Sequence, residues 1–218
     1  MKIKWYGHAA FRITTGKEIR IIIDPYESGA FNGALSYDKI DEEADIVLIS
    51  HDHADHNYVK NIKGKYILID KAGENDTLGI KVEALETFHD KSSGRERGRN
   101  LIFVVTADDL ILVHMGDIGH VLNGELLKTI GKVDIVLLPV GGFFTIDATE
   151  ASGMVTELAP RVIIPMHYKT DKCGFPIAPV EEFTKKQANV RIMDKAEIEI
   201  SKKTLPANPE VVVLRHAL

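Results

Sequence analysis

The sequence predicts a single α/β domain in which short buried strands outnumber helices. Its 218 residues, 44% hydrophobic and 27% charged, are enough to bury one full core. Apolar, β-branched runs recur along the chain, and each is closed by a polar, Gly or Pro signal, as buried strands are. Few windows show helical spacing. We therefore expect one domain spanning residues 1–218.

The predicted elements follow in chain order. The expected strands are Lys2–Trp5, Ala10–Thr14, Ile19–Ile23, Ile46–Ser50, Tyr66–Ile69, Lys81–Thr87, Leu101–Thr106, Leu110–Met115, Ile135–Val140, Val162–Pro165, Val190–Met193 and Val211–Leu214. The expected helices are Ala54–Asn61, Gly119–Ile130, Ala148–Leu158 and a segment from Pro179 to about Ala188. The third of these helices has the best signals, because Asp147 with Glu150 three residues on forms a capping box and Pro160 ends the helix.

The two halves of the chain resemble each other. Ile19–Asp24, followed by Asp45-Ile46-Val47-Leu48, is echoed by Leu110–Asp117, followed by Asp134-Ile135-Val136-Leu137. Each is a strand that ends at an acid, followed by a strand with the same four opening residues. Chance and internal duplication both account for this pattern. No Pro/Gly/Ser-rich linker separates the halves, so we expect them to share one domain.

Net charge and cysteine content indicate which classes of partner and which compartment to expect. Lys and Arg number 27 against 32 Asp and Glu, and the net charge of −5 supplies no footprint for nucleic acid or for an anionic membrane. No apolar run approaches the ~20 residues of a membrane span, and no secretory signal opens the chain. A lone Cys173 fits a reducing compartment. We expect a soluble cytoplasmic protein with a small-molecule partner.

The densest polar motif is His51-Asp52-His53-Ala54-Asp55-His56, directly after an expected strand. Residue frequencies put a chance His-x-His-x-Asp-His at on the order of one in a thousand. His51 and His53 face the same way if the chain is extended, whereas Asp55 and His56 would lie in a first helical turn and point elsewhere. The segment can thus supply two adjacent metal sites.

Three more candidate ligands follow apolar runs elsewhere: His89, Asp117 and His167. With all seven positions filled, the sequence resembles the metallo-β-lactamase superfamily over nearly its whole length. That resemblance implies a four-layer αββα sandwich, with two mixed β-sheets, helices on the outer faces and metals at one sheet edge. The segments Trp5–Ala10, Ile23-Asp24-Pro25 and Gly116-Asp117 are similar to the branch that contains the ascorbate-6-phosphate lactonase.

The resemblance also implies a division of the ligands. His51, His53 and His89 would hold one ion, Asp55, His56 and His167 would hold the second, and Asp117 would bridge them. Asp55 is therefore both a ligand and a catalytic candidate. Two divalent ions would share a water, lower its pKa and present hydroxide to a lactone, ester, amide or phosphodiester bond. Zinc is the first choice, and manganese, nickel or iron suit the same ligand types.

Several neighbours are second candidates, each with a structural alternative. His8 would donate a proton to the leaving group or touch substrate, or it is a histidine satisfied in a turn. In the loop Asp90–Arg99, Arg95 and Arg97 would bind a phosphate or carboxylate of the substrate, or they lie on a solvated hairpin tip. Lys169, next to His167, has the same two interpretations.

The remaining polar residues of interest are assigned supporting or structural roles. Asp52 and Asp24 are candidates for orienting a ligating imidazole, although Asp24 also suits a turn cap. His114 and His120 are expected to be structural.

The predicted function is a metal-dependent hydrolase acting on a small molecule. The alternative is a non-catalytic, metal-binding member of the same fold, because ligands alone do not prove an open substrate site. A nuclease is disfavoured by the negative net charge.

Overall fold

The computed structural model describes all residues 1–218 and contains two β-sheets with short helices. The strands are β1 (Lys2–Gly7), β2 (Ala10–Thr14), β3 (Arg20–Ile23), β4 (Ile46–Leu48), β5 (Ile67–Ile69), β6 (Gly73–Thr77), β7 (Ile80–Phe88), β8 (Arg99–Ala107), β9 (Leu110–His114), β10 (Ile135–Pro139), β11 (Val162–Met166), β12 (Val190–Ile192), β13 (Glu197–Glu199) and β14 (Glu210–Val213). The helices are α1 (Ala30–Gly33), α2 (Gly124–Ile130), α3 (Ala148–Leu158) and α4 (Glu181–Thr184).

Both sheets are mixed, which confirms the expected α/β class. The six-stranded sheet has the order β13-β1-β2-β3-β4-β5 and is antiparallel except for the pairs β3–β4 and β4–β5. The eight-stranded sheet has the order β12-β14-β11-β10-β9-β8-β7-β6 and is parallel from β12 to β9. Strand β13 joins the first sheet although β12 and β14 lie in the second, so the C-terminal segment ties the two sheets together.

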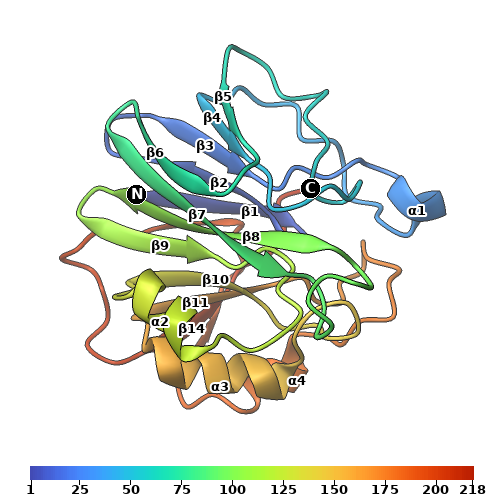
Figure 1. Cartoon of the computed structure of the whole chain (residues 1–218), viewed down its shortest axis with the longest axis vertical. Helices are drawn as coiled ribbons and strands as arrows, with labels where there is room; N and C mark the ends of the chain where they lie inside the picture. The colour runs from blue at the N-terminus through green and yellow to red at the C-terminus, as the bar shows by residue number, and fades with distance from the viewer.

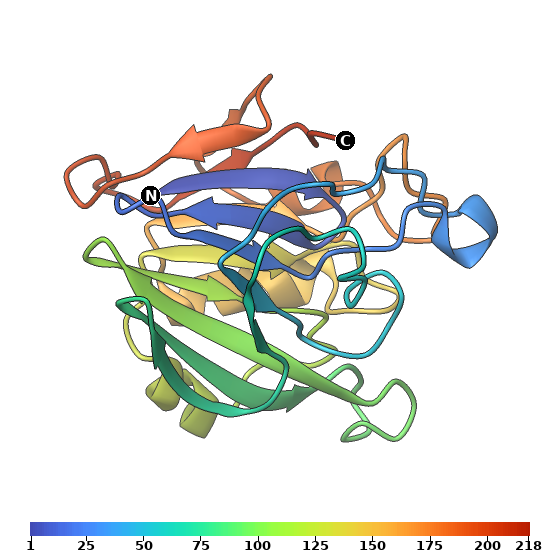
Figure 2. The same cartoon turned by 90° about the horizontal axis from the view of Figure 1, so that it is seen from above.

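The sheets face each other across one large apolar core, and Figures 1 and 2 show them as stacked layers. Alternation along the strands produces this core, because successive side chains point to opposite faces. In the six-stranded sheet, Trp5, Phe11 and Ile21 point inward, whereas Tyr6 and Ile22 belong to a second, smaller cluster on the outer face. Burying both faces explains why these strands read as almost continuous apolar runs.

The two outer faces are covered differently. Helices α2, α3 and α4 lie on the side of the eight-stranded sheet that faces away from the other sheet (Figure 1). The outer face of the six-stranded sheet packs mainly against extended segments, through Tyr26, Tyr37 and Phe175. The short α1 projects from the body of the molecule (Figure 1). The outer layer on this side therefore consists mostly of loops.

Three expected helices differ from the structure. Ala54–Asn61 forms turns, because the single turn closed by the His53 carbonyl ends where the Tyr58 N–H donates to the Pro25 carbonyl at 2.7 Å. Helix α2 begins at Gly124, after Asn123 accepts the Leu126 N–H as its cap. Helix α4 is a four-residue turn rather than a ten-residue helix. Helix α3 begins at the predicted capping box.

Two strands were missed because neither carries an apolar signal. Strand β6 at the sheet edge has the sequence Gly-Glu-Asn-Asp-Thr, and β13 is Glu-Ile-Glu. Edge strands are commonly polar, so period-2 hydrophobicity does not reveal them. No helix in the structure has the length and apolar character to cross a membrane.

Candidate metal centre

The candidate ligands meet because their strands run in the same direction. Strands β1, β3 and β4 end at one edge of the first sheet, and β7, β9 and β11 end at one edge of the second. The polar residues that follow these ends are His8, Asp24, the His51–His56 segment, His89, Asp117 and His167. The carboxyl ends of such strands are where α/β scaffolds place working groups.

One group of candidates consists of three histidines. The imidazole rings of His51 and His53 have centroids 4.5 Å apart, and the ring of His89 lies 4.8 Å from His51 and 5.3 Å from His53. Their ligand atoms lie within 4.8 Å of one another. His53 is the exposed member, while the other two are buried. This is the trio that the sequence predicts for the first ion.

The second group is fully buried and contains Asp55, His56 and His167, with His8 beside them. The Asp55 carboxylate lies 3.0 Å from His8 Nε2 and 3.7 Å from His56 Nε2. The rings of His8 and His167 have centroids 4.1 Å apart. The structure thus adds His8 to the trio that the sequence predicts for the second ion.

Asp117 lies between the two groups. Its Oδ2 atom is 3.2 Å from His56 Nε2, 3.3 Å from His89 Nε2 and 3.0 Å from His167 Nε2. One carboxylate oxygen therefore contacts a member of the first group and two members of the second. This position is the one expected of a shared ligand.

The cluster suits divalent ions because many of its buried nitrogen and oxygen atoms have no hydrogen-bond partner. Buried polar groups in folded proteins nearly always have a hydrogen-bond partner. Of the nine buried side-chain nitrogen or oxygen atoms that lack one here, seven belong to this cluster. They are His8 Nδ1, His51 Nε2, Asp55 Oδ1, His56 Nε2, His89 Nδ1, Asp117 Oδ1 and His167 Nδ1. Imidazole nitrogens and carboxylate oxygens are suitable ligands for zinc and for several other transition metals.

A buried acid orients two of the histidines. His56 Nδ1 donates to Asp24 Oδ2 at 2.9 Å. His51 Nδ1 donates to the Ser50 hydroxyl at 2.9 Å, and that hydroxyl donates to Asp24 at 2.6 Å. Both rings therefore keep Nε2 free as a lone-pair donor facing the centre, which is how carboxylates fix metal-ligating imidazoles. Asp24 is completely buried and is a positioning residue, as the sequence suggests.

The electrostatics of the cluster favour positive charge next to its carboxylates. Burial alone would raise the pKa of Asp117, but His167 and His56 outweigh it and hold that pKa well below its ordinary value. Burial would lower the pKa of His56, yet Asp117 and Asp55 raise it well above the ordinary value. Burial, reinforced by His167, lowers the pKa of His8 to about 4. The field of the two carboxylates thus stabilises a cation at this point.

The backbone around the cluster is strained. His8, Asp24 and His167 have φ values of 52°, 48° and 51°, in the left-handed region that residues with a Cβ rarely adopt. Gly116, at φ 55°, precedes Asp117 where a Cβ would collide with Asn100 and Ser50. Strain of this kind costs of order 1–3 kcal/mol per residue and is concentrated at functional sites.

Asn100 fixes the backbone of Asp117. Its Oδ1 accepts the Asp117 N–H at 2.8 Å, and its Nδ2 donates to Thr87 and to the Met115 carbonyl. Asn100 is buried, so all of these hydrogen bonds are shielded from water. A single Asn within an apolar strand was the available sequence signal for this role.

The loop after His89 separates the two candidate arginines. Burial opposes ionisation of Asp90, but N–H groups of Arg97, Glu96, Ser92 and Gly94 bind its carboxylate and lower its pKa to about 2. The loop is wound around this acid and is not a loose hairpin tip.

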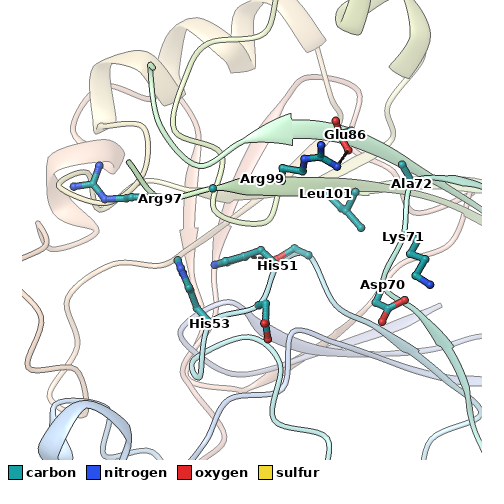
Figure 3. Close-up of a pocket in the computed structure, with 12 residues that line it drawn as sticks. His51, His53, Asp70, Lys71, Ala72, Glu86, Arg97, Arg99 and Leu101 are labelled. Carbon is teal, nitrogen blue, oxygen red and sulfur yellow. Dashed lines mark hydrogen bonds and ion pairs between the residues drawn. The ribbon is translucent and has the colours of Figure 1, made fainter. Parts of the chain in front are cut away.

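Of the two arginines, Arg97 lines the cavities beside His53, whereas Arg95 is exposed and its Nε donates to the Ser92 carbonyl. In Figure 3, Arg97 and His53 lie toward one end of a polar pocket, with the guanidinium of Arg97 directed away from His53, and Asp70 and Lys71 lie at the other end.

The other candidates lie apart from the centre. Lys169 Nζ donates to the Phe175 carbonyl at 2.8 Å and lines none of the cavities around the cluster. Asp52 binds Asn57 and is exposed at the polar pocket. His114 is buried between the Ala9 carbonyl and the Gly116 N–H, which agrees with a structural role. His120 lies in a loop, with Nδ1 against the Val121 carbonyl.

Sequence reasoning missed the aromatic side of the site. Phe31, Phe144 and Phe175 line a cavity of about 330 Å³ together with His53, Asp55, Asp117, His167 and Arg97. Phe31 comes from the short α1, and Phe144 and Phe175 come from two separate loops, so no spacing in the sequence connects the three rings. An apolar residue between Gly29 and Gly33 was the one available sequence signal for Phe31.

Comparison with known proteins agrees with this geometry. A family model described as a beta-lactamase superfamily domain matches residues 2–167. A UPF0173 metal-dependent hydrolase from Thermococcus onnurineus is 34% identical, over 93% of this chain and 96% of that protein. Another from Pyrococcus horikoshii is 31% identical, with 93% and 96% covered.

Solved structures show the same architecture. A proposed Zn-dependent hydrolase of the metallo-beta-lactamase superfamily from Thermotoga maritima superimposes with a TM-score of 0.82 at 33% identity, covering 98% of this chain and 97% of that one. Igni18, a metallo hydrolase from Ignicoccus hospitalis, shares the fold with a TM-score of 0.67 at 22% identity, covering 92% and 99%. The family match, the relatives and the His/Asp cluster together place this chain in the metallo-β-lactamase superfamily, as a member of the UPF0173 family of metal-dependent hydrolases.

Proposed function

We propose that the chain hydrolyses a small-molecule lactone, ester, amide or phosphodiester bond at a centre for two divalent ions. The observation that carries this proposal is the pair of ligand groups joined by Asp117, whose buried atoms lack other partners. His51, His53 and His89 would hold one ion, and Asp55, His56 and His167 the other. The resemblance to the ascorbate-6-phosphate lactonase branch makes a lactone the first bond to test.

When bound, the two ions supply a water of lowered pKa and a Lewis acid for the oxygen under attack. In ester or lactone hydrolysis the water oxygen bonds to the carbonyl carbon, the bond to the leaving oxygen breaks, and a water proton ends on that oxygen. The protein needs no Ser or Cys nucleophile, and its own part is to orient the reactants. Asp117 and Asp55 would hold the ions in place, and Asp24 would fix the imidazoles of His51 and His56.

His8 is assigned a positioning role rather than a substrate contact. Its Nε2 donates to Asp55, it is fully buried, and it lines neither cavity beside the cluster. It therefore acts on the reaction through the Asp55 carboxylate.

Zinc is the proposed metal. Histidine and carboxylate ligands suit it, and the Thermotoga maritima relative is described as Zn-dependent. Manganese, nickel and iron suit the same ligands and are the alternatives to exclude.

Arg97 is proposed to bind an anionic group of the substrate. It lines both cavities next to His53, and its one ion pair is with the exposed Glu96 at 3.8 Å. Arg95 and Lys169 are bound to carbonyls outside these cavities. Of the three cationic candidates for substrate binding, Arg97 is therefore the one that we retain.

Metal content measured by plasma mass spectrometry tests the centre. Protein purified without a metal-binding tag and then incubated with zinc should hold about two ions per chain, and His89→Ala should hold about one. His120→Ala is the matched control, because His120 lies in a neighbouring loop outside both ligand groups, and it should keep both ions. A wild-type protein that holds no ion with any of the four metals would contradict the proposal.

A substrate panel distinguishes the enzyme from a non-catalytic metal-binding protein. Zinc-loaded wild type should hydrolyse at least one of a set of lactones, esters and phosphodiesters, and Asp117→Ala should not. Full metal occupancy with no turnover of any member would favour the non-catalytic alternative.

A further inference from the structure

Three aromatic rings, those of Phe31, Phe144 and Phe175, form a wall of the cavity beside the candidate ligands. Phe175 also packs in the apolar cluster on the outer face of the six-stranded sheet, whereas Phe31 does not belong to that cluster. The ring centroid of Phe175 is 5.3 Å from that of Phe31 and 5.6 Å from that of Phe144, with edge-to-face geometry at both contacts. Phe175 is buried, but Phe31 is 50% exposed. Half-exposed aromatic rings gathered in a concave site beside polar groups are typical of ligand contacts.

The backbone holds Phe31 in place at a cost. Phe31 and Asn32 have φ values of 54° and 57°, between Gly29 and Gly33, which are also left-handed. A left-handed residue with a Cβ costs roughly 1–2 kcal/mol. Burial in the core does not offset this strain, because the ring lies at the cavity. Strain of this kind is concentrated at ligand clamps and active sites, and here it places an exposed aromatic ring in the cavity beside the candidate ligands.

Arg97 borders the three aromatic rings at Phe144. Its guanidinium lies over the Phe144 ring at 5.7 Å, and its backbone N–H is fixed by Asp90 at 2.8 Å. The charged group therefore lies next to Phe144, and Arg97 lines the same cavity as the three rings and His53. A ligand in this 330 Å³ cavity meets metal ligands on one side, apolar rings on another and a cation at the rim.

We propose that the substrate is a small ester or lactone with an apolar group, the size of a phenyl ring or a short alkyl chain, next to the scissile bond. That group would pack against Phe31, Phe144 and Phe175. This inference rests on the proposed function and adds the substrate class. Phosphodiesters of polar sugars do not offer such a group.

Two readouts test the pocket in the zinc-loaded protein. The first is kcat/KM for nitrophenyl esters of acetate, butanoate and hexanoate, which should rise by up to about fourfold for each methylene that reaches the wall. The second is calorimetric binding of phenylacetate and acetate, which share a carboxylate. Phenylacetate should bind at least tenfold more tightly, because its ring adds apolar burial.

Phe31→Ala is the informative variant, because a half-exposed side chain on a strained turn can be removed without opening the core. It should flatten the ester series and reduce the preference for phenylacetate at least threefold. Leu78→Ala is the matched control, because Leu78 is also 50% exposed and left-handed, with a φ of 53°, and it lines neither cavity beside the cluster. It should leave both readouts unchanged.

The outcomes separate this proposal from the hydrolase proposal. If no ester is hydrolysed but the preference for phenylacetate depends on Phe31, the pocket is supported and the proposed reaction fails. If esters are hydrolysed with no dependence on chain length and phenylacetate binds no better than acetate, the pocket proposal is overturned and the hydrolase stands. Equal losses in Phe31→Ala and Leu78→Ala would also overturn it.

Discussion

The two halves of the molecule share a local motif, but the acids that follow it have different roles. In the six-stranded sheet the Asp45 N–H donates to the Arg20 carbonyl and the Asp45 carboxylate accepts the Arg20 N–H at 2.8 Å. In the eight-stranded sheet the Asp134 N–H donates to the Ile111 carbonyl and its carboxylate accepts the Ile111 N–H at 3.0 Å. The repeated Asp-Ile-Val-Leu segment thus fixes two equivalent parallel strand pairs, β3–β4 and β9–β10.

The halves diverge just beyond these strands. The Asp24 N–H donates to the Leu48 carbonyl, and the Met115 N–H donates to the Leu137 carbonyl, so Asp24 aligns with Met115. The acid of the second half comes two residues later, after the left-handed Gly116. That extension carries Asp117 off the sheet and into the centre, whereas Asp24 remains beneath the imidazoles. A shift of two residues therefore distinguishes the candidate metal ligand Asp117 from Asp24, which orients the neighbouring imidazoles.

The largest expected effect comes from the acid on the extended turn. Asp117→Ala should reduce kcat on the order of 10³-fold or more and lower metal content below two ions per chain, because it removes the carboxylate shared by both groups. Steady-state kinetics and plasma mass spectrometry check both effects. Near-normal turnover with two bound ions would show that the carboxylate is dispensable.

A smaller effect is expected for the acid beneath the imidazoles. Asp24→Asn should weaken metal binding by about 10–100-fold, because His51 and His56 lose the carboxylate that orients them. Competition with a chelator measures this affinity. Asp45→Asn, in the same half but remote from the ligands, is the control, and equal weakening in both variants would refute the assignment.

Next in size is the contrast between two arginines of one loop. Arg97→Ala should raise KM about tenfold for an ester that carries a free carboxylate and little for its neutral counterpart, because a charge-assisted contact is lost. Arg95→Ala should change neither value, since that side chain is exposed and bound to Ser92. Equal changes for charged and neutral substrates would show that Arg97 does not select anions.

The smallest effects compare the equivalent acids of the two strand pairs. Asp134 is buried, so Asp134→Asn should cost about 1–3 kcal/mol of unfolding free energy, and the more exposed Asp45→Asn about 1 kcal/mol or less. Urea unfolding measures both values. Equal losses of unfolding free energy in the two variants would mean that burial does not distinguish Asp134 from Asp45.

Acid titration sharpens this last comparison. The hydrogen bonds of Arg20 hold the pKa of Asp45 below its ordinary value of 3.8 in the folded state. A depressed pKa contributes stability above the unfolded value, and that stability is lost as the pH falls through the folded value. The difference in stability between wild type and Asp45→Asn should therefore shrink as the pH is lowered below about 4. A difference that is the same at pH 5 and at pH 2 would contradict this linkage.

Much of this protein could be predicted from local patterns. The buried strands are visible because both faces of each sheet are apolar, and helix α3 because its capping box is local. The seven candidate ligands were found because each follows a strand end, and parallel strands bring such ends together. The expected helix at Ala54–Asn61 was wrong because contacts with the distant Pro25 segment override local propensity.

Contacts between distant loops account for what the residue patterns did not specify. Arg95 and Arg97 are equivalent in sequence, and it is the winding of the loop around Asp90 that aims one of them at the cavity. Phe31, Phe144 and Phe175 lie far apart along the chain and meet only after the sheets stack. The amino-acid pattern therefore specifies which strands form and which residues could bind metal, because these depend on periodicity and spacing. Folding of the loops specifies which side chains face the substrate, because that depends on long-range packing.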